Sequence, residues 1–491
     1  MSLINLELLD DQKTIEEDNL IIGSGAGGST IAYELLKSGK RSIILEEGPN
    51  IAENKKLNIG KSIVNYYRNN GATPILSSNG GPLIGYGQGS CVGGSTYVNA
   101  GYFSNTPEWI FNEWIKQGKT ILEYKDFQKL LSEIKNELKV NVEELTHSDG
   151  DSKYLLDRSN KINWKIEKCE RFSTGEVGAE KQTMNNSYHK HLLKNKIDII
   201  HDCKVEKIIV QNGYAKSIKA INKVNKKIYN FKFKNLFINC GPINTPHLLL
   251  KNRLIKFDSK VKDFEFHLNF KILVKFKKEI NFNTSNEFNP DLPVSIFFMR
   301  EFEKDGALLS AANSELSYMM ATSSHFSDDI KKDIYLNNKN YAMFIYQIKS
   351  NSTGNIRNLL NSPIVSYEYN QKDNYEIKKG IQRTANFFLN EDVDHILYPI
   401  ENSLPIRNIK DSNHLSENFN PKKLHLVSVH GMSSMRPGND SKFHTNHHGK
   451  VNGYKNIYIN DASILPGNTG ESPQASIMAF AKFIAKNLKE N

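Results

Sequence analysis

Three glycines near the N-terminus have the spacing of a phosphate-binding turn. Gly23, Gly25 and Gly28 form the pattern GxGxxG. The apolar run at residues 19–22 predicts a buried parallel strand before them, and residues 29–38 predict a helix after them. Gly23 allows the tight turn, Gly25 lets the backbone approach a pyrophosphate, and Gly28 lets the helix pack closely on the strand. The helix N-terminus adds unpaired N–H groups and the positive end of the helix dipole.

An acidic residue follows the next predicted strand. Residues 41–45 form that apolar strand, and Glu46 stands at its end. A carboxylate at this position can accept hydrogen bonds from ribose hydroxyls. The glycine pattern alone would be weak, but its place between a strand and a helix, with Glu46 beyond, predicts dinucleotide binding. This segment alone does not distinguish an NAD-binding site from an FAD-binding site.

A second glycine cluster favours the larger cofactor. Residues 87–99 contain Gly93 and Gly94, followed by Ser95 and Asn99. An NAD enzyme needs no second glycine-rich loop here, whereas a ribityl chain and a tricyclic ring need more backbone close to them.

Two later strands are predicted to end beside the same ligand. One ends at Gly241, and the other, at residues 456–460, ends at Asp461. Ligands of open α/β sheets bind at the carboxyl ends of the strands. A loop follows Asp461, and an amphipathic helix is predicted from Ser472-Pro473 onward.

These motifs, in this order, resemble the GMC (glucose–methanol–choline) flavin oxidoreductases. The matching segments are GSGAGGS, GSCVGGSTYVNAG, NCGPINTPHLLL, NIYINDASILPG and SPQASIMAFA. The resemblance implies an α/β fold with two domains. A Rossmann-like FAD-binding domain with a parallel sheet would comprise residues 1–255 and 425–491, with insertions around 55–80 and 105–185. A substrate-binding domain with a largely antiparallel sheet would comprise residues 256–424, where the resemblance is loose.

The resemblance also implies a set of FAD contacts. They are Gly23, Gly25, Ala26, Gly28, Glu46, Gly93, Gly94, Ser95, Asn99, Val205, Gly241, Asp461, Ala462, Pro473 and Gln474. The backbone at Val205 would face the adenine ring, and the final helix would point its N-terminus at the flavin. Some relatives attach FAD to a histidine near the second glycine cluster. The segment Tyr97-Val98-Asn99 has none, so we expect non-covalent FAD.

Alcohol oxidation by a flavin needs a base for the hydroxyl proton, and histidine suits this task because its pKa lies near neutrality. His430 matches the histidine that the family places here, which implies the role of catalytic base. The alternative is a buried histidine at a strand end, bonded to backbone.

Ser472 stands where the family usually has His or Asn, and it departs from that pattern. Substrate contact is one interpretation of Ser472, and capping of the final helix is the other. Glu471 is a further candidate for binding a substrate amine or hydroxyl.

His444, His447 and His448 are close in sequence and stand in a polar loop. We expect a solvated loop and no metal site.

Residues 256–424 contain alternating apolar segments that predict an antiparallel sheet. The predicted strands are at 264–277, 291–300, 315–324, 341–350 and 362–370, and a helix is predicted at 373–388. Some of the aromatic side chains here are candidates for lining a pocket, although most are expected in the core: Phe297, Phe298, Tyr318, Phe344 and Tyr346. The many polar residues favour a hydroxylated substrate.

The composition excludes several classes of protein. The 491 residues carry a formal charge of +10, but the lysines are scattered and form no long cationic run, so we expect no nucleic-acid partner. The sequence contains no run of about 18 apolar residues, so it predicts no membrane span. The four cysteines form no CxxC pair, and the N-terminus lacks a signal pattern, so we expect a cytoplasmic protein.

The sequence therefore predicts an FAD-dependent alcohol dehydrogenase or oxidase, with a small-molecule alcohol as substrate. The electron acceptor, whether oxygen, a quinone or a redox protein, is not identified by the residues. A lyase with non-redox FAD and a degenerate, non-catalytic flavoprotein remain alternatives. The second glycine cluster argues against a nicotinamide dehydrogenase.

Overall fold

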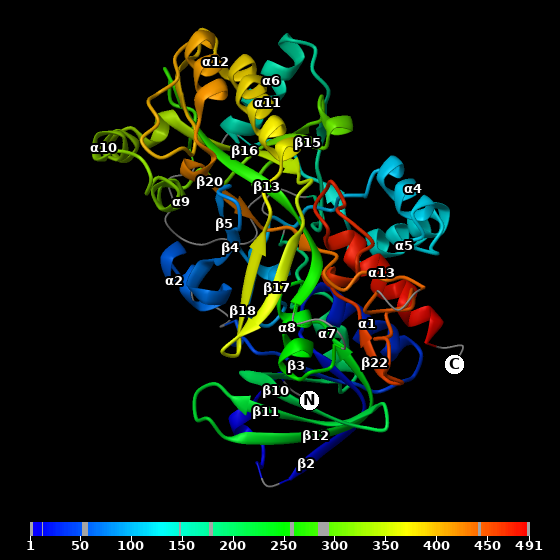
Figure 1. The fold of residues 1–491 in the computed structure, drawn as a ribbon. Helices are drawn as coiled ribbons and strands as arrows, with labels where there is room; N and C mark the ends of the chain where they lie inside the picture. Colours follow the sequence, from blue (N-terminus) through cyan, green and yellow to red (C-terminus); the bar gives the residue numbers. More distant parts are fainter. Residues whose placement is uncertain are drawn as a thin grey trace.

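The computed structural model describes residues 3–11, 13–51, 57–146, 149–175, 180–255, 260–282, 294–439 and 443–488. Its strands form two large sheets, the first below the second in Figure 1, with helices packed around both. A small third sheet pairs β6 (Asn141–Val142) with β8 (Glu170–Arg171).

The first sheet has a parallel core. Its strand order is β1-β9-β3-β2-β12-β11-β10, and β22 also pairs with β12. The bounds are β1 (Leu3–Asn5), β2 (Thr14–Ile22), β3 (Ile43–Leu45), β9 (Asp198–His201), β10 (Cys203–Gln211), β11 (Tyr214–Asn222), β12 (Ile228–Ile238) and β22 (Ile457–Ile459). All pairs are parallel except β10 with β11 and β11 with β12. The predicted Rossmann-like sheet is confirmed.

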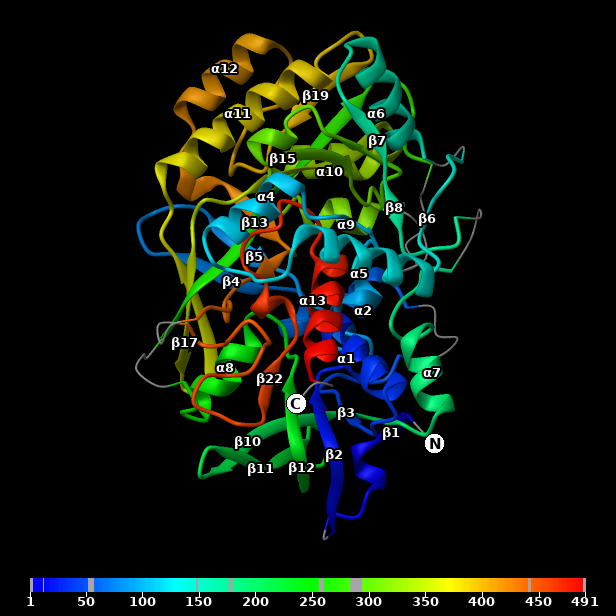
Figure 2. The ribbon, with the colours of Figure 1, turned by 90° about the vertical axis from the view of Figure 1, so that its right-hand side faces the viewer.

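The predicted strand–turn–helix forms as β2, α1 (Ala26–Lys37) and β3. Leu20 and Ile21 are fully buried, as expected for a central parallel strand. The helix begins three residues before the predicted start at 29, because the glycines themselves form its first turn. Helices α7 (Tyr188–Lys194) and α13 (Gln474–Asn487) pack against α1 (Figure 2).

The second sheet is largely antiparallel, as predicted. Its order is β17-β18-β4-β5-β20-β13-β16-β15-β14-β7, and β19 and β21 also pair with β13. The bounds are β4 (Thr73–Ser77), β5 (Leu83–Tyr86), β7 (Ile166–Lys168), β13 (Lys260–Phe276), β14 (Phe297–Met299), β15 (Ala307–Ala311), β16 (Tyr341–Lys349), β17 (Gly354–Leu359), β18 (Ser362–Tyr367), β19 (Val393–Leu397), β20 (His425–Ser428) and β21 (Gly431–Met432). The domain boundaries at 255 and 425 stay a prediction.

Helices cover the far side of the second sheet. Figure 2 shows α6 (Gly150–Lys161), α11 (Gln371–Phe388) and α12 (Ile409–Asn418) at that end of the molecule. The remaining α-helices are α2 (Ile59–Tyr66), α3 (Ser95–Val98), α4 (Glu108–Lys116), α5 (Tyr124–Glu137), α8 (Asn244–Lys251), α9 (Leu316–Ala321) and α10 (Asp328–Leu336). Among the helices in the described ranges, none is both long and apolar enough to cross a bilayer.

One predicted strand is wrong. The segment at 315–324 contains helix α9, because Leu316, Met319 and Met320 recur at helical spacing and Met319 is fully buried. The predicted strands at 264–277, 341–350 and 362–370 are confirmed as β13, β16 and β18, and the helix at 373–388 as α11. Strand β14 lies within the predicted segment 291–300, of which residues 291–293 lie outside the described residues.

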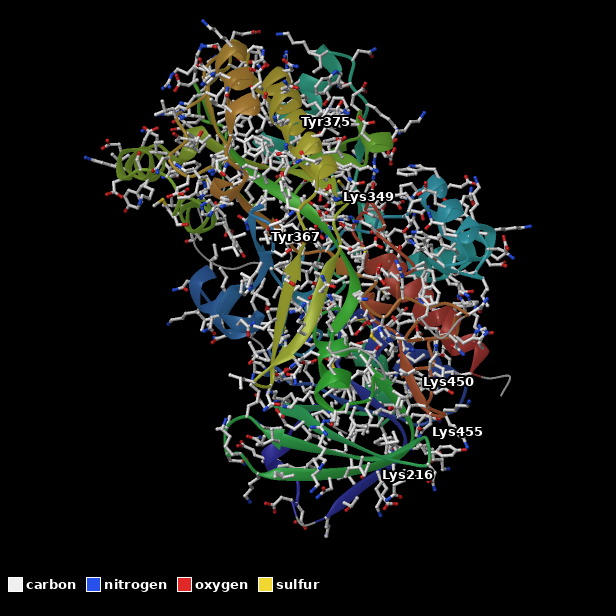
Figure 3. The ribbon with its side chains drawn as sticks, in the orientation of Figure 1. Lys216, Lys349, Tyr367, Tyr375, Lys450 and Lys455 are labelled. Atoms are coloured by element: carbon white, nitrogen blue, oxygen red, sulfur yellow. The ribbon has the colours of Figure 1, made fainter. Side chains whose placement is uncertain are left out.

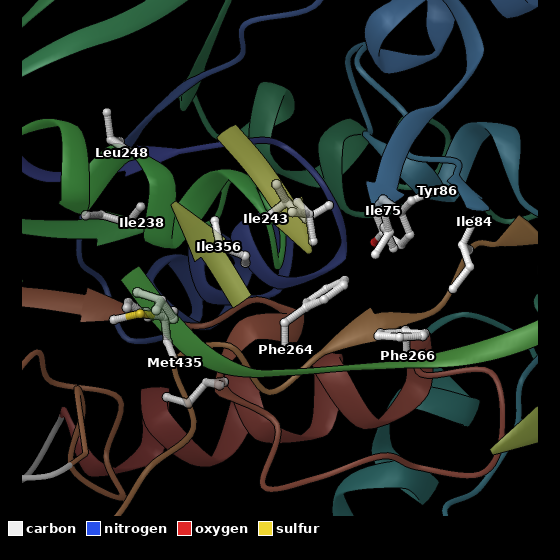
Figure 4. Packing of buried hydrophobic residues seen from close by; sticks show 14 of the residues in the cluster. Ile75, Ile84, Tyr86, Ile238, Ile243, Leu248, Phe264, Phe266, Ile356 and Met435 are labelled. Carbon is white, nitrogen blue, oxygen red and sulfur yellow. The ribbon is translucent and has the colours of Figure 1, made fainter. Parts of the chain in front are cut away.

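A continuous apolar core joins the two sheets. Figure 4 shows Ile238 of β12 and Leu248 of α8 in the same cluster as Phe264 and Phe266 of β13 and Ile356 of β17. All five side chains are buried. The shared core fixes the position of β13 relative to the parallel sheet.

Surface lysines make local contacts. Lys216 and Lys455 lie near each other beside the first sheet (Figure 3), and their ammonium groups are 4.8 and 4.6 Å from the centre of the Tyr214 ring. These are cation–π contacts within the protein.

Candidate functional site

A cavity of about 660 Å³ is lined by residues of both sheets. Glu46 and Val205 line it from the parallel sheet, and Asn269 and Gln347 line it from the second sheet. Ligand sites of proteins commonly measure about 300–1,000 Å³ and lie between layers or domains. This cavity is therefore the candidate site.

The first glycine cluster forms a backbone wall of the cavity. Gly23 has a φ of +95°, and a Cβ there would lie 2.2 Å from the carbonyl oxygen of Asn239. A Cβ at Gly28 would lie 2.0 Å from the carbonyl oxygen of Gly23. Neither position has room for a side chain. No side-chain hydrogen bond caps α1, which leaves the first N–H groups of this helix for a ligand.

The second glycine cluster meets the first. Gly94 has a φ of +57°, and a Cβ there would lie 2.9 Å from the Cα of Gly25. The backbone N–H of Gly93 donates to Oγ of Ser24 at 2.9 Å. The two clusters therefore bring bare backbone to the same part of the cavity.

Two buried carboxyl groups hold these turns. Glu46 accepts hydrogen bonds from the N–H of Ser24 at 3.0 Å, its hydroxyl at 2.7 Å and the N–H of Gly48 at 2.8 Å. Asp461 accepts from the N–H groups of Gly241 at 2.7 Å and Ser463 at 2.8 Å. Burial raises the pKa of both carboxyl groups, and these hydrogen bonds oppose the rise. A carboxylate offers about four acceptor positions, so Glu46 can still accept from a ribose hydroxyl.

Most of the predicted FAD contacts meet in this cavity. Those that line it are Gly23, Gly25, Ala26, Glu46, Gly94, Ser95, Asn99, Val205, Gly241, Asp461, Ala462, Pro473 and Gln474. Gly28 and Gly93 do not line it and instead support the turns behind it. Binding of FAD by each residue stays a prediction.

The cavity wall contains buried polar atoms without a partner. Nδ2 and Oδ1 of Asn239 and Nε of Arg68 bond to no residue in the described ranges. Because buried polar groups in folded proteins are nearly always paired, these atoms fit a polar ligand. Pro473 and Gln474, at the start of α13, also line the cavity. The residues present therefore fit FAD.

His430 lines the same cavity and lies directly before β21. Its Nδ1 is 2.9 Å from Nδ1 of His267 and 3.1 Å from Oε1 of Gln347. Nε2 of His267 is 2.5 Å from Oδ1 of Asn468. Burial lowers the pKa of His430 to about 4 and the pKa of His267 well below its ordinary value. Both rings are therefore neutral near pH 7.

Backbone groups orient the two amides that contact these rings. Oδ1 of Asn468 accepts from the N–H of Gly470 at 3.0 Å, and Nδ2 donates to the carbonyl of Phe266 at 2.9 Å. Nε2 of Gln347 donates to the carbonyl of Gly470 at 3.2 Å. The amide oxygens of Asn468 and Gln347 therefore face the imidazoles. His267, Gln347 and Asn468 are not among the site residues predicted from the sequence.

The capping interpretation of Ser472 is wrong. Helix α13 begins at Gln474, its N-cap is Pro473, and no side chain caps it. Ser472 precedes the N-cap by one residue and lines the cavity, and its contact with a substrate stays a prediction.

Glu471 also lines the cavity. It pairs with Nη1 of Arg300, which bonds Glu303 at 2.8 Å as well. Burial raises the pKa of Glu471, and Arg300 opposes that rise. Oε2 of Glu471 has no partner in the described ranges, so it remains available for a substrate hydroxyl or amine.

Only some of the predicted pocket aromatics reach the cavity. Phe298 and Tyr318 line it. Phe297, Phe344 and Tyr346 do not, and they are buried in the core.

The prediction of a solvated loop at His444, His447 and His448 is also wrong. His447 is buried, and the ring of His448 stacks on Phe483 with 5.8 Å between centroids. Bridges from Thr445 to Val451 and from Lys450 to Tyr458 bind this loop to the protein. No group of three or more His, Cys, Asp or Glu side chains within the described ranges is placed to hold a metal ion.

Two family models, both described as GMC oxidoreductase, match residues 17–254 and 350–481. An uncharacterized GMC-type oxidoreductase of Sinorhizobium fredii is 24% identical over 97% of this chain and 95% of its own length. A long-chain-alcohol oxidase of Arabidopsis thaliana is 24% identical over 50% of this chain and 35% of its own length.

Solved structures share the fold at low identity. Pyridoxine 4-oxidase from Mesorbium loti has a TM-score of 0.75 at 13% identity, covering 96% of this chain and 99% of its own. A variant of Aspergillus oryzae formate oxidase, studied for FAD modification, has a TM-score of 0.78 at 14% identity, covering 98% of this chain and 99% of its own.

Proposed function

Because this chain belongs to the GMC oxidoreductase family, we propose that it oxidises the CH–OH group of a polar, hydroxylated alcohol such as a sugar or polyol, using non-covalently bound FAD. Bound FAD would supply the two-electron acceptor for the hydride that leaves the carbinol carbon. The hydroxyl proton would pass to His430, and the product would be the carbonyl compound. The two electrons would finally pass to an external acceptor, which is oxygen, a quinone or a redox protein.

The observation that carries this proposal is the hydrogen-bond chain behind His430. The oxygen of Asn468 accepts, so Nε2 of His267 carries the proton of that neutral ring. Nδ1 of His267 is then an acceptor, and Nδ1 of His430 must donate to it. Gln347 offers a second acceptor to the same N–H. His430 is therefore held in the tautomer whose Nε2 has a free lone pair.

That lone pair is the expected acceptor of the substrate proton. His430 lines the cavity, and its hydrogen bonds within the part of the chain that the structure describes involve Nδ1 and not Nε2. After proton uptake, the positive charge on His430 faces the lone pair of His267 and the amide oxygen of Gln347, which stabilise it. His267, Asn468 and Gln347 act as positioning residues in this proposal.

The polar wall of the cavity supports a hydroxylated substrate. Oδ1 of Asn269, Oε2 of Glu315 and Oε2 of Glu471 are buried, line the cavity and lack a partner in the described ranges. Substrate hydroxyl groups can donate to all three oxygens. A long apolar chain would leave them unpaired, at about 1–3 kcal/mol each.

The test is an anaerobic screen of alcohols, scored by bleaching of the flavin absorbance near 450 nm. The wild-type holoenzyme should bleach with its substrate, and H430A should stay yellow but lose about 10²–10⁴-fold in the rate of bleaching. Turnover of a substrate without bleaching would favour a lyase. Bleaching of H430A at the wild-type rate would remove His430 from the role of base.

A further inference from the structure

One face of β13 carries polar side chains at alternate positions. His267, Asn269 and Lys271 are two residues apart, so they point to the same face of the strand. Asn269 and Lys271 line the cavity, and His267 bonds to His430. A strand through the core would ordinarily bury apolar residues on this face, so the polar row calls for a ligand.

Lys271 has no counter-charge in the structure. In the described ranges it makes no hydrogen bond, ion pair or cation–π contact, and burial is the sole cause that lowers its pKa, to about 8. Its cross-strand neighbour is Ile345, and the next residue across the sheet is Ser310. Lys275, four residues further along the same strand, pairs with Asp333 at 2.7 Å. Buried ammonium groups are ordinarily paired in this way.

Asn269 is the second unpaired group in this row. Asn269 is 2% exposed, and neither its Oδ1 nor the donor of interest here, its Nδ2, has a hydrogen-bond partner in the described ranges. Lys271 and Asn269 together offer up to five N–H donors to the cavity. Both residues are therefore arranged to receive an acceptor-rich group.

The register of the sheet places this pair beside the predicted base. Asn269 lies opposite Gln347, the residue that bonds Nδ1 of His430. Lys271 lies two residues further along the strand, which is about 7 Å. A substrate with its carbinol at His430 and a charged group a few bonds away would reach Lys271.

Two carboxyl groups of the cavity do not neutralise Lys271. Asp151 accepts from the N–H of Ser152 at 2.6 Å and the hydroxyl of Ser314 at 3.4 Å, and Glu315 pairs with no cation in the described ranges. Burial raises the pKa of Asp151 and of Glu315 to about 7. Each therefore carries only part of a negative charge near neutral pH.

We propose that Lys271 and Asn269 form an anion subsite, and that the natural substrate is an alcohol bearing a carboxylate or phosphate group. This inference rests on the proposed function and specifies the class of its substrate. The ammonium of Lys271 would pair with the anion, and the amide of Asn269 would donate to a second oxygen of it.

The experiment compares wild-type holoenzyme with K271M, K271R and the control K275M. Inorganic phosphate and acetate are titrated while the absorbance of the oxidised flavin is followed. Anaerobic flavin reduction is then measured with matched alcohols: gluconate against sorbitol for the carboxylate, and glucose 6-phosphate against glucose for the phosphate. K275M removes a paired lysine from the same strand and should behave like wild type.

The expected result is that anions perturb the flavin spectrum and that the charged alcohol of at least one pair is preferred. K271M should weaken both effects about 10- to 100-fold, as for the loss of a charge-assisted hydrogen bond, and K271R should restore most of them. Neutral alcohols have no charged group for the subsite, so K271M should lower their rates of flavin reduction much less than the rates of the charged alcohols. The subsite would be overturned if K271M still bound anions and still preferred the charged alcohol. It would also be overturned if the wild type showed neither effect. If the subsite were overturned but neutral alcohols still bleached the flavin, the proposed function would stand. If anions bound but no alcohol bleached the flavin, the proposed function alone would be contradicted.

Discussion

At the scale of the residue, the acceptor at Nδ1 of His267 fixes which nitrogen of His430 carries a proton. H267N keeps an oxygen near the position of that nitrogen, whereas H267F keeps the volume and removes the acceptor. We expect H267F to lower the rate constant of flavin reduction by at least about tenfold, with little change in the substrate concentration at half saturation. H267N should recover most of the loss.

The two variants separate positioning from packing. Both leave the FAD contacts untouched, so the flavin spectrum should not change. Equal losses in H267N and H267F would indicate that His267 acts through packing, and the hydrogen-bond chain would then have no part in the reaction.

The pKa of His430 predicts the acid limit of activity. Burial lowers this pKa to about 4, so the ring can accept a proton throughout the range above that value. As the pH falls through about 4, His430 becomes protonated and the rate should fall with it. The acidic side of the pH–rate profile can be measured by stopped-flow flavin reduction with a neutral alcohol. A pH jump from pH 7 allows the rate to be recorded before the protein unfolds. A half-point near 6.5 would mean that the ring is solvated in the working enzyme.

The sequence predicted the candidate site in part. The spacing of Gly23, Gly25 and Gly28 is a local signal, and the cavity brings most of the predicted contacts together. His267 and Lys271 were missed because their role depends on the register of β13 against β16, which is a non-local pairing. The alternation of polar residues at 267, 269 and 271 was the available signal, and a search for period two among polar residues would have found it.

At the scale of the element, a buried lysine connects three helices. Lys482 of α13 is fully buried and contacts Glu34 of α1 at 2.8 Å and Glu137 of α5 at 2.9 Å. Lys37 also pairs with both carboxylates from the surface side. We expect K482M to lower the free energy of unfolding by about 3 kcal/mol, because buried carboxylates lose their main partner.

K486M is the matched control for that measurement. Lys486 lies one turn later on α13, is 49% exposed and pairs with Glu133 at 2.9 Å. K486M should lower the free energy of unfolding, measured with urea, by at most about 1 kcal/mol. Equal midpoints for K482M and K486M would show that burial of Lys482 adds nothing to the stability of the helix cluster.

Elements with strong local signals were predicted best. The glycine turn, β13 and α11 follow from spacing and periodicity, whereas α9 was mistaken for a strand because six residues are too few to separate the two periods. The predicted cap at Ser472 failed because α13 begins at Gln474, which makes Pro473 and not Ser472 the N-cap residue.

At the scale of the molecule, the sequence indicated two sheets but not that they share a core and a cavity. Ile238 and Phe264 belong to one apolar cluster although they come from different sheets. Such contacts between distant segments have no local pattern. The cavity likewise takes its walls from both sheets, through Val205 on one side and Gln347 on the other.

This shared cavity predicts that FAD stabilises the whole molecule. A ligand that binds only the folded state adds RT ln(1 + [L]/Kd), which is about 2.7 kcal/mol at 100 times Kd. The melting temperature of the apoprotein should therefore rise with the logarithm of the FAD concentration. FMN is the control, because it lacks the adenylate half that Glu46 and Val205 are predicted to contact, and it should raise the melting temperature less. If FMN and FAD gave equal shifts, the glycine turn and Glu46 would not hold the dinucleotide. If neither gave a shift, the cavity between the sheets would not be a flavin site.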